Sequence, residues 1–258
     1  MKWLRTIVVF DKGNVVAERD WAAVHESYVR SIEAVEHPAN SGKFTLRRKV
    51  RLPNGQWKRN GVGYMRSSFL RQMVDVEKWQ REAAVELRRD RIQPTLRLYP
   101  KGDAHREPIT SDFGGFDFQT VTKEGLRVVI EWETGNISSS HRSMNKLAIA
   151  LASGVIQVGV LIVPSRACYE QLTDRIGNIG ELSGYLELWE AAKAAVQRGL
   201  LAISVVEHDE ITDDQTVPYL KVGDDGRAKK AKAKAATRIK AARAKAARLR
   251  RELKGRRE

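Results

Sequence analysis

Three acidic side chains lie close together in a stretch whose pattern could bind a metal ion. Residues 116–133 are typical of two strands joined by a tight turn. Side chains alternate across a strand, so Glu131 and Glu133 project to one face while Trp132 points to the other. If the two strands pair, Asp117 approaches both glutamates. Converging carboxylates repel one another unless a cation lies between them, so the pattern predicts a Mg²⁺ site with room for water and a phosphate.

A second interpretation of these acids is a solvated strand face, because a hairpin with one wet face also shows alternating acids. The apolar run 128–130 favours a strand buried on both faces instead. Acids at the end of such a strand are costly without a compensating partner. Asp112 competes with Asp117 as the first acid, although it follows a Thr-Ser pair where it could equally stabilise a turn. Glu82 or Glu86 could add a further acid.

The elements that follow the acids indicate how they are held. After Glu133, a polar turn leads into a helix predicted over about 140–153, in which Met144, Leu147, Ala148 and Leu151 form one apolar stripe. The apolar segment 155–163 then predicts a buried strand. A helical crossover between strands requires a parallel pair, so the order hairpin, helix, strand predicts a mixed α/β sheet.

This combination of acids and elements resembles the catalytic core of the PD-(D/E)XK nucleases, and more narrowly the BamHI/BglII-type restriction endonucleases. The resemblance is clearest over about residues 110–165. Most of that superfamily has lysine at the third motif position, where this chain has Glu133. The departure points to the BamHI-like branch, in which the position is glutamate or glutamine. The resemblance implies a mixed central sheet flanked by helices.

The resemblance also implies roles for individual residues. Asp117 and Glu131 would hold Mg²⁺, for which Mn²⁺ can substitute, against the scissile phosphate. Glu133 would act as a metal ligand or as the general base for the attacking water. The segment at the start of the helix meets the DNA in this family, which here means Asn136, Ser138, Ser139, His141 and Arg142. Turn and capping chemistry is the alternative interpretation of these five residues.

The basic charge is concentrated at the carboxyl end of the chain. Residues 227–258 contain 15 Lys and Arg and two Glu, whereas the rest of the chain holds 31 basic and 30 acidic side chains. We therefore expect an endonuclease domain at 1–222, with its catalytic core at about 110–206, and a basic Ala/Lys/Arg-rich tail at 223–258. The tail cannot bury a core and suits a polyanion, or serves solubility only.

A second basic segment lies near the amino end. Residues 44–52 alternate, and residues 53–56 form a good hairpin turn into residues 57–62. Six cations flank that turn: Arg47, Arg48, Lys49, Arg51, Lys58 and Arg59. This hairpin could grip phosphates or could be an ordinary exposed ribbon. Farther along, the amphipathic pattern of 181–198 predicts one helix, and 200–206 predicts an apolar strand. The acids and histidine at 207–210 could suggest a second metal cluster, but adjacent side chains of a strand point to opposite faces, so a polar strand exit is the favoured interpretation.

Composition limits the remaining possibilities. No apolar run reaches the roughly 18 residues that a membrane span needs, and the amino terminus lacks the apolar length of a signal peptide. Cys168 is the single cysteine, which fits a reducing cytoplasm. We predict a Mg²⁺-dependent, site-specific endonuclease for duplex DNA, acting as a homodimer. The alternatives are a repair or junction nuclease on the same fold and a non-catalytic nucleic-acid-binding protein that uses the tail.

Overall fold

A computed structural model describes residues 1–83, 115–173 and 176–221 of the 258-residue chain. The sequence interpretations for Asp112, Glu86 and the basic tail at 223–258 fall outside these residues. Within the described part of the chain, no helix has both the length and the apolar character needed to cross a membrane.

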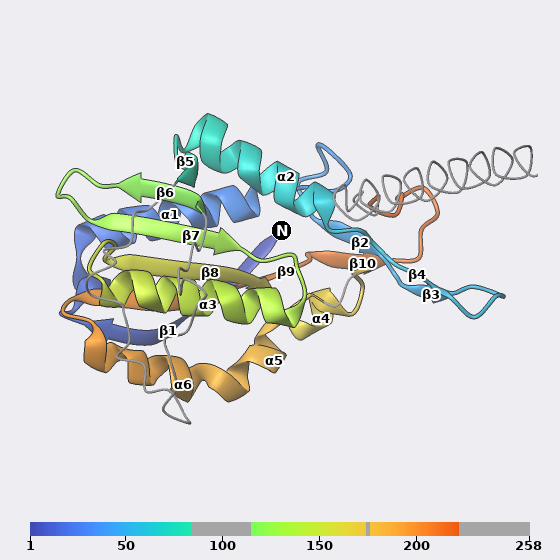
Figure 1. Cartoon of the computed structure of the whole chain (residues 1–258). Coiled ribbons are helices and arrows are strands. Elements are labelled where there is room, and N and C mark those ends of the chain that lie inside the picture. The colour runs from blue at the N-terminus through green and yellow to red at the C-terminus, as the bar shows by residue number, and fades with distance from the viewer. Residues whose placement is uncertain (84–114, 174–175, 222–258) are drawn as a thin grey trace, which may run out of the picture. The chain divides into compact units, whose positions relative to one another are not determined.

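The fold is organised around a six-stranded mixed sheet (Figure 1). Its strands, in spatial order, are β1 (Lys2–Lys12), β9 (Gly199–Glu207), β8 (Val158–Pro164), β7 (Arg127–Trp132), β6 (Phe116–Val121) and β5 (Gln80–Ala83). Strands β7, β8 and β9 are mutually parallel, whereas β1, β5 and β6 pair antiparallel with their neighbours. The predicted hairpin and the predicted parallel pair are therefore both confirmed.

Helices cover both faces of this sheet, and alternation along β7 shows how. Val128, Ile130 and Trp132 pack into one hydrophobic cluster, which includes residues of α1 (Arg19–Glu33) and α2 (Gly63–Arg71). Val129 packs into the other cluster, with α3 (Ile137–Ala152) and α6 (Leu186–Glu190). The strand is thus buried on both faces, as its continuous apolar run predicts.

The predicted single helix over 181–198 is wrong. The structure has α5 (Ile179–Leu182), a 3₁₀ turn (Ser183–Tyr185), α6 and a second 3₁₀ turn (Ala191–Ala195) in its place. A Ser-Gly pair interrupts the segment, and both residues are poor at continuing a helix. The apolar positions still reach the core, because Leu182 and Trp189 are both buried against the α3 side of the sheet.

Two small sheets lie outside the central one. β2 (Thr45–Arg47) pairs in parallel with β10 (Glu210–Thr212), and β3 (Val50–Arg51) pairs antiparallel with β4 (Trp57–Lys58). Short helices η1 (Val15–Ala17) and α4 (Arg166–Tyr169) and a π turn at Gln72–Val76 complete the described elements. Asp209 in the segment 207–210 accepts hydrogen bonds from the amino terminus and from the Phe44 backbone, at 3.0 and 2.7 Å, which supports its interpretation as a strand exit.

Helix α3 is held on the sheet by close packing at Leu147. This side chain is fully buried, and a Cβ added to Gly159 of β8 would lie 3.2 Å from it. The helix therefore approaches the strand closely at a position that has no side chain. Because α3 follows directly after the acids of β7, this packing also fixes where the start of the helix lies.

We expect Leu147→Ala to lower the free energy of unfolding by about 2–5 kcal/mol, because it leaves a cavity between α3 and β8. Chemical denaturation followed by circular dichroism measures this loss. Leu188→Ala is the matched control, since Leu188 is 67 % exposed and its truncation should change stability by no more than about 0.5 kcal/mol. Equal losses in the two variants would contradict this account of the packing.

Candidate active site

The three predicted acids lie where β6 and β7 meet. The register pairs Phe118 with Ile130, and continuing it by one residue sets Asp117 opposite Glu131. Glu133 follows the end of β7, and its backbone N–H still donates to the Ile162 carbonyl of β8 at 3.0 Å. Strand pairing alone therefore brings the acids to the carboxyl end of β7, as the sequence predicts.

Asp117 is fixed by one backbone contact and one ion pair. Its Oδ2 accepts a hydrogen bond from the Trp132 backbone N–H at 3.0 Å, which ties β6 to the end of β7. Its Oδ1 pairs with the guanidinium of Arg66 at 2.9 Å. Arg66 comes from α2, and its side chain is 46 % exposed. The sequence gives no indication of this pairing, because 51 residues separate the partners.

Glu131 forms a buried ion pair with Lys146 of α3. The ammonium lies 2.5 Å from Glu131 Oε1 and 2.6 Å from the Gly115 carbonyl, and it also lies 4.1 Å from the centre of the Phe116 ring. These three acceptors match the three donors of an ammonium group. Both charged side chains are at most 10 % exposed. Burial raises the pKa of Glu131 to about 7, and the Lys146 charge opposes that shift.

Glu133 is anchored by the turn that follows it. Its Oε1 accepts the Gly135 backbone N–H at 2.5 Å, and its Oε2 accepts the Ser143 hydroxyl at 3.3 Å. A Cβ on Gly135 would lie 2.7 Å from Glu133 Oε1, so a side chain at this position would displace the carboxylate from its present place. Burial raises the pKa of Glu133, while these two hydrogen bonds and the charge of Arg142 act in the opposite direction.

The acids are close enough to interact through their charges. The negative charges of Asp117 and Glu133 raise the pKa of Glu131, and that of Asp117 also raises the pKa of Glu133. Within the described ranges, no three acidic, histidine or cysteine side chains already form a cluster that could hold a metal ion. The donor set itself fits a hard divalent cation, since it consists of mutually repelling carboxylates. Arg66 and Lys146 provide positive charge at the site instead.

The five residues predicted to meet DNA are placed at or near the start of α3. Asn136 is the N-cap, and its Oδ1 accepts the Ser139 backbone N–H at 3.1 Å, so the capping interpretation holds for this pair. Ser138 and Arg142 are exposed. The ring of His141 packs edge-on against Tyr185, at 4.3 Å between ring centres. A DNA contact for each of the five stays a prediction.

Lys146 is the main functional candidate that the sequence reasoning missed. The helical spacing places Lys146 on the buried face of α3, because residues 143, 146 and 150 share that face and all three are buried. A lysine on a buried helix face requires a partner. The helix alone does not identify that partner, since Glu131 lies on a strand.

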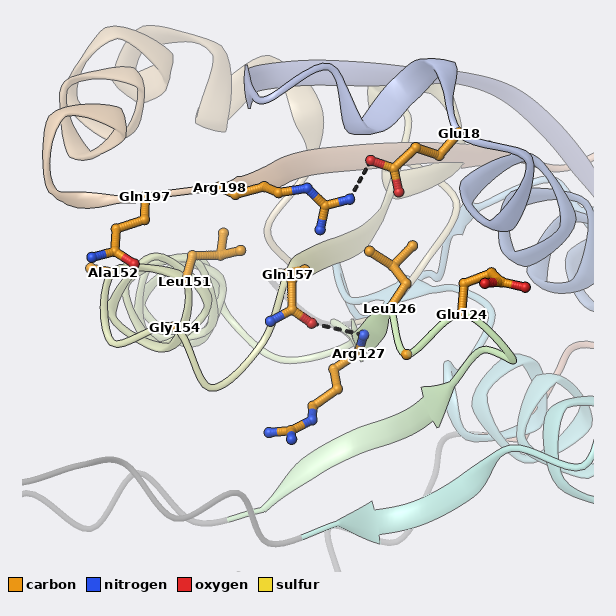
Figure 2. Close-up of a pocket in the computed structure, with 11 residues that line it drawn as sticks. Glu18, Glu124, Leu126, Arg127, Leu151, Ala152, Gly154, Gln157, Gln197 and Arg198 are labelled. Atoms are coloured by element: carbon orange, nitrogen blue, oxygen red, sulfur yellow. Dashed lines mark hydrogen bonds and ion pairs between the residues drawn. The ribbon is translucent and has the colours of Figure 1, made fainter.

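A recess lies at the other end of the sheet (Figure 2). It has a volume of about 480 Å³ and is lined at the start of β7 and just before β8 by Arg127 and Gln157. Figure 2 shows the hydrogen bond between these two residues and the ion pair of Arg198 with Glu18. Six residues along a strand separate Arg127 from Glu133, about 20 Å. This recess is therefore separate from the acids.

Fold and acids together place the protein in the restriction-endonuclease-like class of α/β proteins. The family model of the restriction endonuclease BamHI matches residues 1–227. The chain therefore belongs to the BamHI restriction endonuclease family, which confirms the resemblance inferred from residues 110–165.

Two relatives with known names and one solved structure are similar to the chain. The type II restriction enzyme OkrAI of Oceanobacter kriegii is 46 % identical over 104 residues, covering 40 % of this chain and 52 % of OkrAI. The chain thus matches about half the length of that relative. The type II restriction enzyme BamHI of Bacillus amyloliquefaciens is 29 % identical over 198 residues, covering 75 % of this chain and 77 % of BamHI. A crystal structure of the restriction endonuclease BglII complexed with a DNA 16-mer has a TM-score of 0.48 and 9 % identity, over 80 % of this chain and 79 % of that chain.

We expect Lys146→Met to destabilise the metal-free protein by about 1–3 kcal/mol at pH 7, because it leaves the buried Glu131 carboxyl group without its partner. The loss should shrink as the pH is lowered from 7 to 5. A carboxylate whose pKa is raised becomes protonated in that window and no longer requires a counter-charge. Urea denaturation at both pH values measures this difference.

The double variant Lys146→Met/Glu131→Gln is the control for this experiment. It removes both charges, so it should recover much of the stability that the single variant loses at pH 7. A single variant that is equally unstable at pH 5 and pH 7 would contradict the ion-pair account, and would indicate that packing of the lysine stem dominates.

Proposed function

We propose that this protein is a type II restriction endonuclease that hydrolyses phosphodiester bonds in duplex DNA at a specific sequence, with Mg²⁺ as its cofactor. The observation that carries the proposal is the placement of Asp117, Glu131 and Glu133 at one end of paired strands, in a chain of the BamHI family. Mn²⁺ is expected to substitute, because it also accepts carboxylate and water ligands.

Asp117, Glu131 and Glu133 are the residues proposed to hold the divalent cation. When bound, the cation offsets negative charge that develops on the phosphate and lowers the pKa of a nearby water. The mutual repulsion of the carboxylates favours such binding, since a cation relieves it. Arg66 is the partner that a cation would displace most readily from the acids, because its side chain is half exposed and contacts Asp117 through a single hydrogen bond.

Glu133 is the proposed general base for the attacking water. Burial raises its pKa above the ordinary value of a carboxyl group, which makes the carboxylate a stronger base. The Gly135 N–H and the Ser143 hydroxyl orient the carboxylate and keep it from rotating away from the acids. Lys146, about one turn farther along the same face of α3 as Ser143, keeps Glu131 oriented in the same way.

The start of α3 is the proposed DNA-contacting element. Its helix N-terminus attracts phosphate, and Asn and Arg side chains are suited to adenine and guanine edges in the major groove. Asn136 and Arg142 are both exposed there. We further propose a cytoplasmic homodimer, because two sites related by a two-fold axis can cut both strands of a palindrome.

We expect Glu133→Ala to lower the rate of DNA cleavage by about 10²–10⁴-fold, the usual contribution of a general base. Incubating the purified protein with a mixed-sequence plasmid, with and without Mg²⁺, should give discrete fragments only with the metal. Glu124→Ala is the matched control, because Glu124 is an exposed acid in the turn at the far end of the same hairpin. A thermal melt of each variant separates loss of activity from loss of folding.

Other outcomes would favour other functions. Cleavage of branched DNA but not of linear duplex would favour a repair or junction nuclease on the same fold. An intact plasmid with both Mg²⁺ and Mn²⁺, together with salt-sensitive DNA binding that Glu131→Ala leaves unchanged, would contradict the endonuclease proposal. The basic tail would then be the main DNA contact of a non-catalytic binding protein.

A further inference from the structure

A basic hairpin, which we call the basic arm and define as residues 47–59, extends from the central fold. It contains β3 and β4 (Figure 1), and every residue from 50 to 58 is exposed to solvent. Val50, Leu52 and Trp57 are among these exposed residues. A two-stranded hairpin without a packed face is only marginally stable in water. Its exposure therefore points to a role in contacting another molecule.

The basic arm has one sign of charge. It contains six basic residues and no acidic one, namely Arg47, Arg48, Lys49, Arg51, Lys58 and Arg59. Arg48 forms a surface ion pair with Asp213, and Lys49 lies 3.9 Å from Glu170. No carboxylate of the described residues pairs with Arg51 or Lys58. The arm thus retains uncompensated positive charge on both strands.

An exposed aromatic ring lies among these cations. The Trp57 side chain is 51 % exposed, and the Lys49 ammonium and the Arg59 guanidinium each lie 5.8 Å from its ring centre. Two further cations lie over the Tyr219 ring: the Lys58 ammonium is 4.6 Å from the ring centre, and the Arg47 guanidinium is 5.0 Å from it. Aromatic rings that hold cations in place reduce the entropy lost when those cations bind an anion.

The base of the arm lies on the same side of the fold as the acids. The Asn60 backbone N–H donates to the Gln171 carbonyl at 2.9 Å, and the Thr173 N–H donates to the Asn60 carbonyl at 2.8 Å. Three residues farther on, Ile176 forms a bridge with Asn136, the N-cap of α3. Three residues span at most about 11 Å, so the base of the arm lies near the proposed DNA-contacting helix.

A shared crevice supports the same placement. Val62 and Met65, which follow the arm directly, line an apolar crevice together with Leu172, Ile176 and Glu133. The segment after the arm therefore lies close to Glu133 of the candidate active site. The base of the arm and the acids are therefore close enough for one duplex to contact both.

We propose that the basic arm binds the phosphate backbone of duplex DNA outside the cleaved position. This inference rests on the proposed function and names a surface that contributes affinity independent of sequence. A polyanion fits this surface better than a second copy of the chain, since the arm of a copy carries the same charge. Arg51 and Lys58 contact phosphates, and Trp57 packs against the sugar–phosphate backbone between them.

The test compares the salt dependence of DNA binding for the full chain and for Arg51→Gln/Lys58→Gln. Fluorescence anisotropy with a labelled duplex, in EDTA to prevent cleavage, gives the slope of log K against log [salt]. Each lost phosphate contact should make the slope less negative by about 0.9, so the double variant should differ by about 2 for each protomer bound to the duplex. The matched control is Arg19→Gln/Lys123→Gln, which removes two exposed charges elsewhere and should leave the slope unchanged.

Cross-linking tests the position of the arm directly. Cys168 is the only cysteine and is fully buried, so Gln56→Cys at the exposed tip of the arm provides a single accessible thiol. A photoreactive reagent on this thiol should cross-link to the duplex, whereas the same reagent on Lys123→Cys should give a background level. Either equal slopes for the two double variants or equal cross-linking from the two thiols overturns the arm proposal.

The same experiments distinguish failure of the arm from failure of the proposed function. If the unaltered chain cuts plasmid and binds duplex DNA but its arm variants behave as the controls do, the arm proposal alone is wrong. If the unaltered chain neither binds nor cuts duplex DNA, both proposals are wrong.

Discussion

The buried ion pair between Lys146 and Glu131 is the constraint on which the rest of the site depends. Each of these charges would be costly in the core alone, and their 2.5 Å contact offsets part of that cost. The same ammonium also binds the Gly115 carbonyl, directly before β6. One side chain thus joins α3 to β7 and to the start of β6. The helix that is proposed to meet DNA is fixed to the two strands that carry the acids, so the spacing between DNA and acids is set by the core.

The acids differ in how readily they can change partner. Lys146 is almost fully buried and binds three acceptors, so Glu131 keeps its position. Arg66 is half exposed and contacts Asp117 through one nitrogen, so this contact can break at little cost. In the proposed nuclease, Asp117 is therefore the acid that would change partner if a cation were held there, and Glu131 would keep its position. Glu133 is intermediate in how firmly it is held, because it accepts hydrogen bonds from the Gly135 backbone N–H and the Ser143 hydroxyl but pairs with no cation among the described residues.

Local patterns were sufficient to predict the elements around the acids but not the groups that compensate them. The hairpin, α3 and β8 follow from alternation, an apolar stripe and an apolar run, all of which are local in the sequence. Arg66 and Lys146 reach the acids only through tertiary packing, across 51 and 15 residues. Helix α3 begins at Ile137 and not at about residue 140 as predicted, because Asn136 caps it. The roles of the acids and of the DNA-contacting residues remain predictions, since they depend on ligands.

Capping and DNA recognition are compatible at the start of α3. The Oδ1 atom of Asn136 accepts the Ser139 N–H, which leaves the amide nitrogen of the same exposed side chain as a donor. The cap fixes the rotamer of this side chain before any ligand binds, so less entropy is lost when the amide donates to a base or phosphate. Glu133 follows the same logic, because the Gly135 N–H that shapes the turn also orients its carboxylate. Residues that stabilise the turn between β7 and α3 are thereby the ones held ready for the chemistry that we propose.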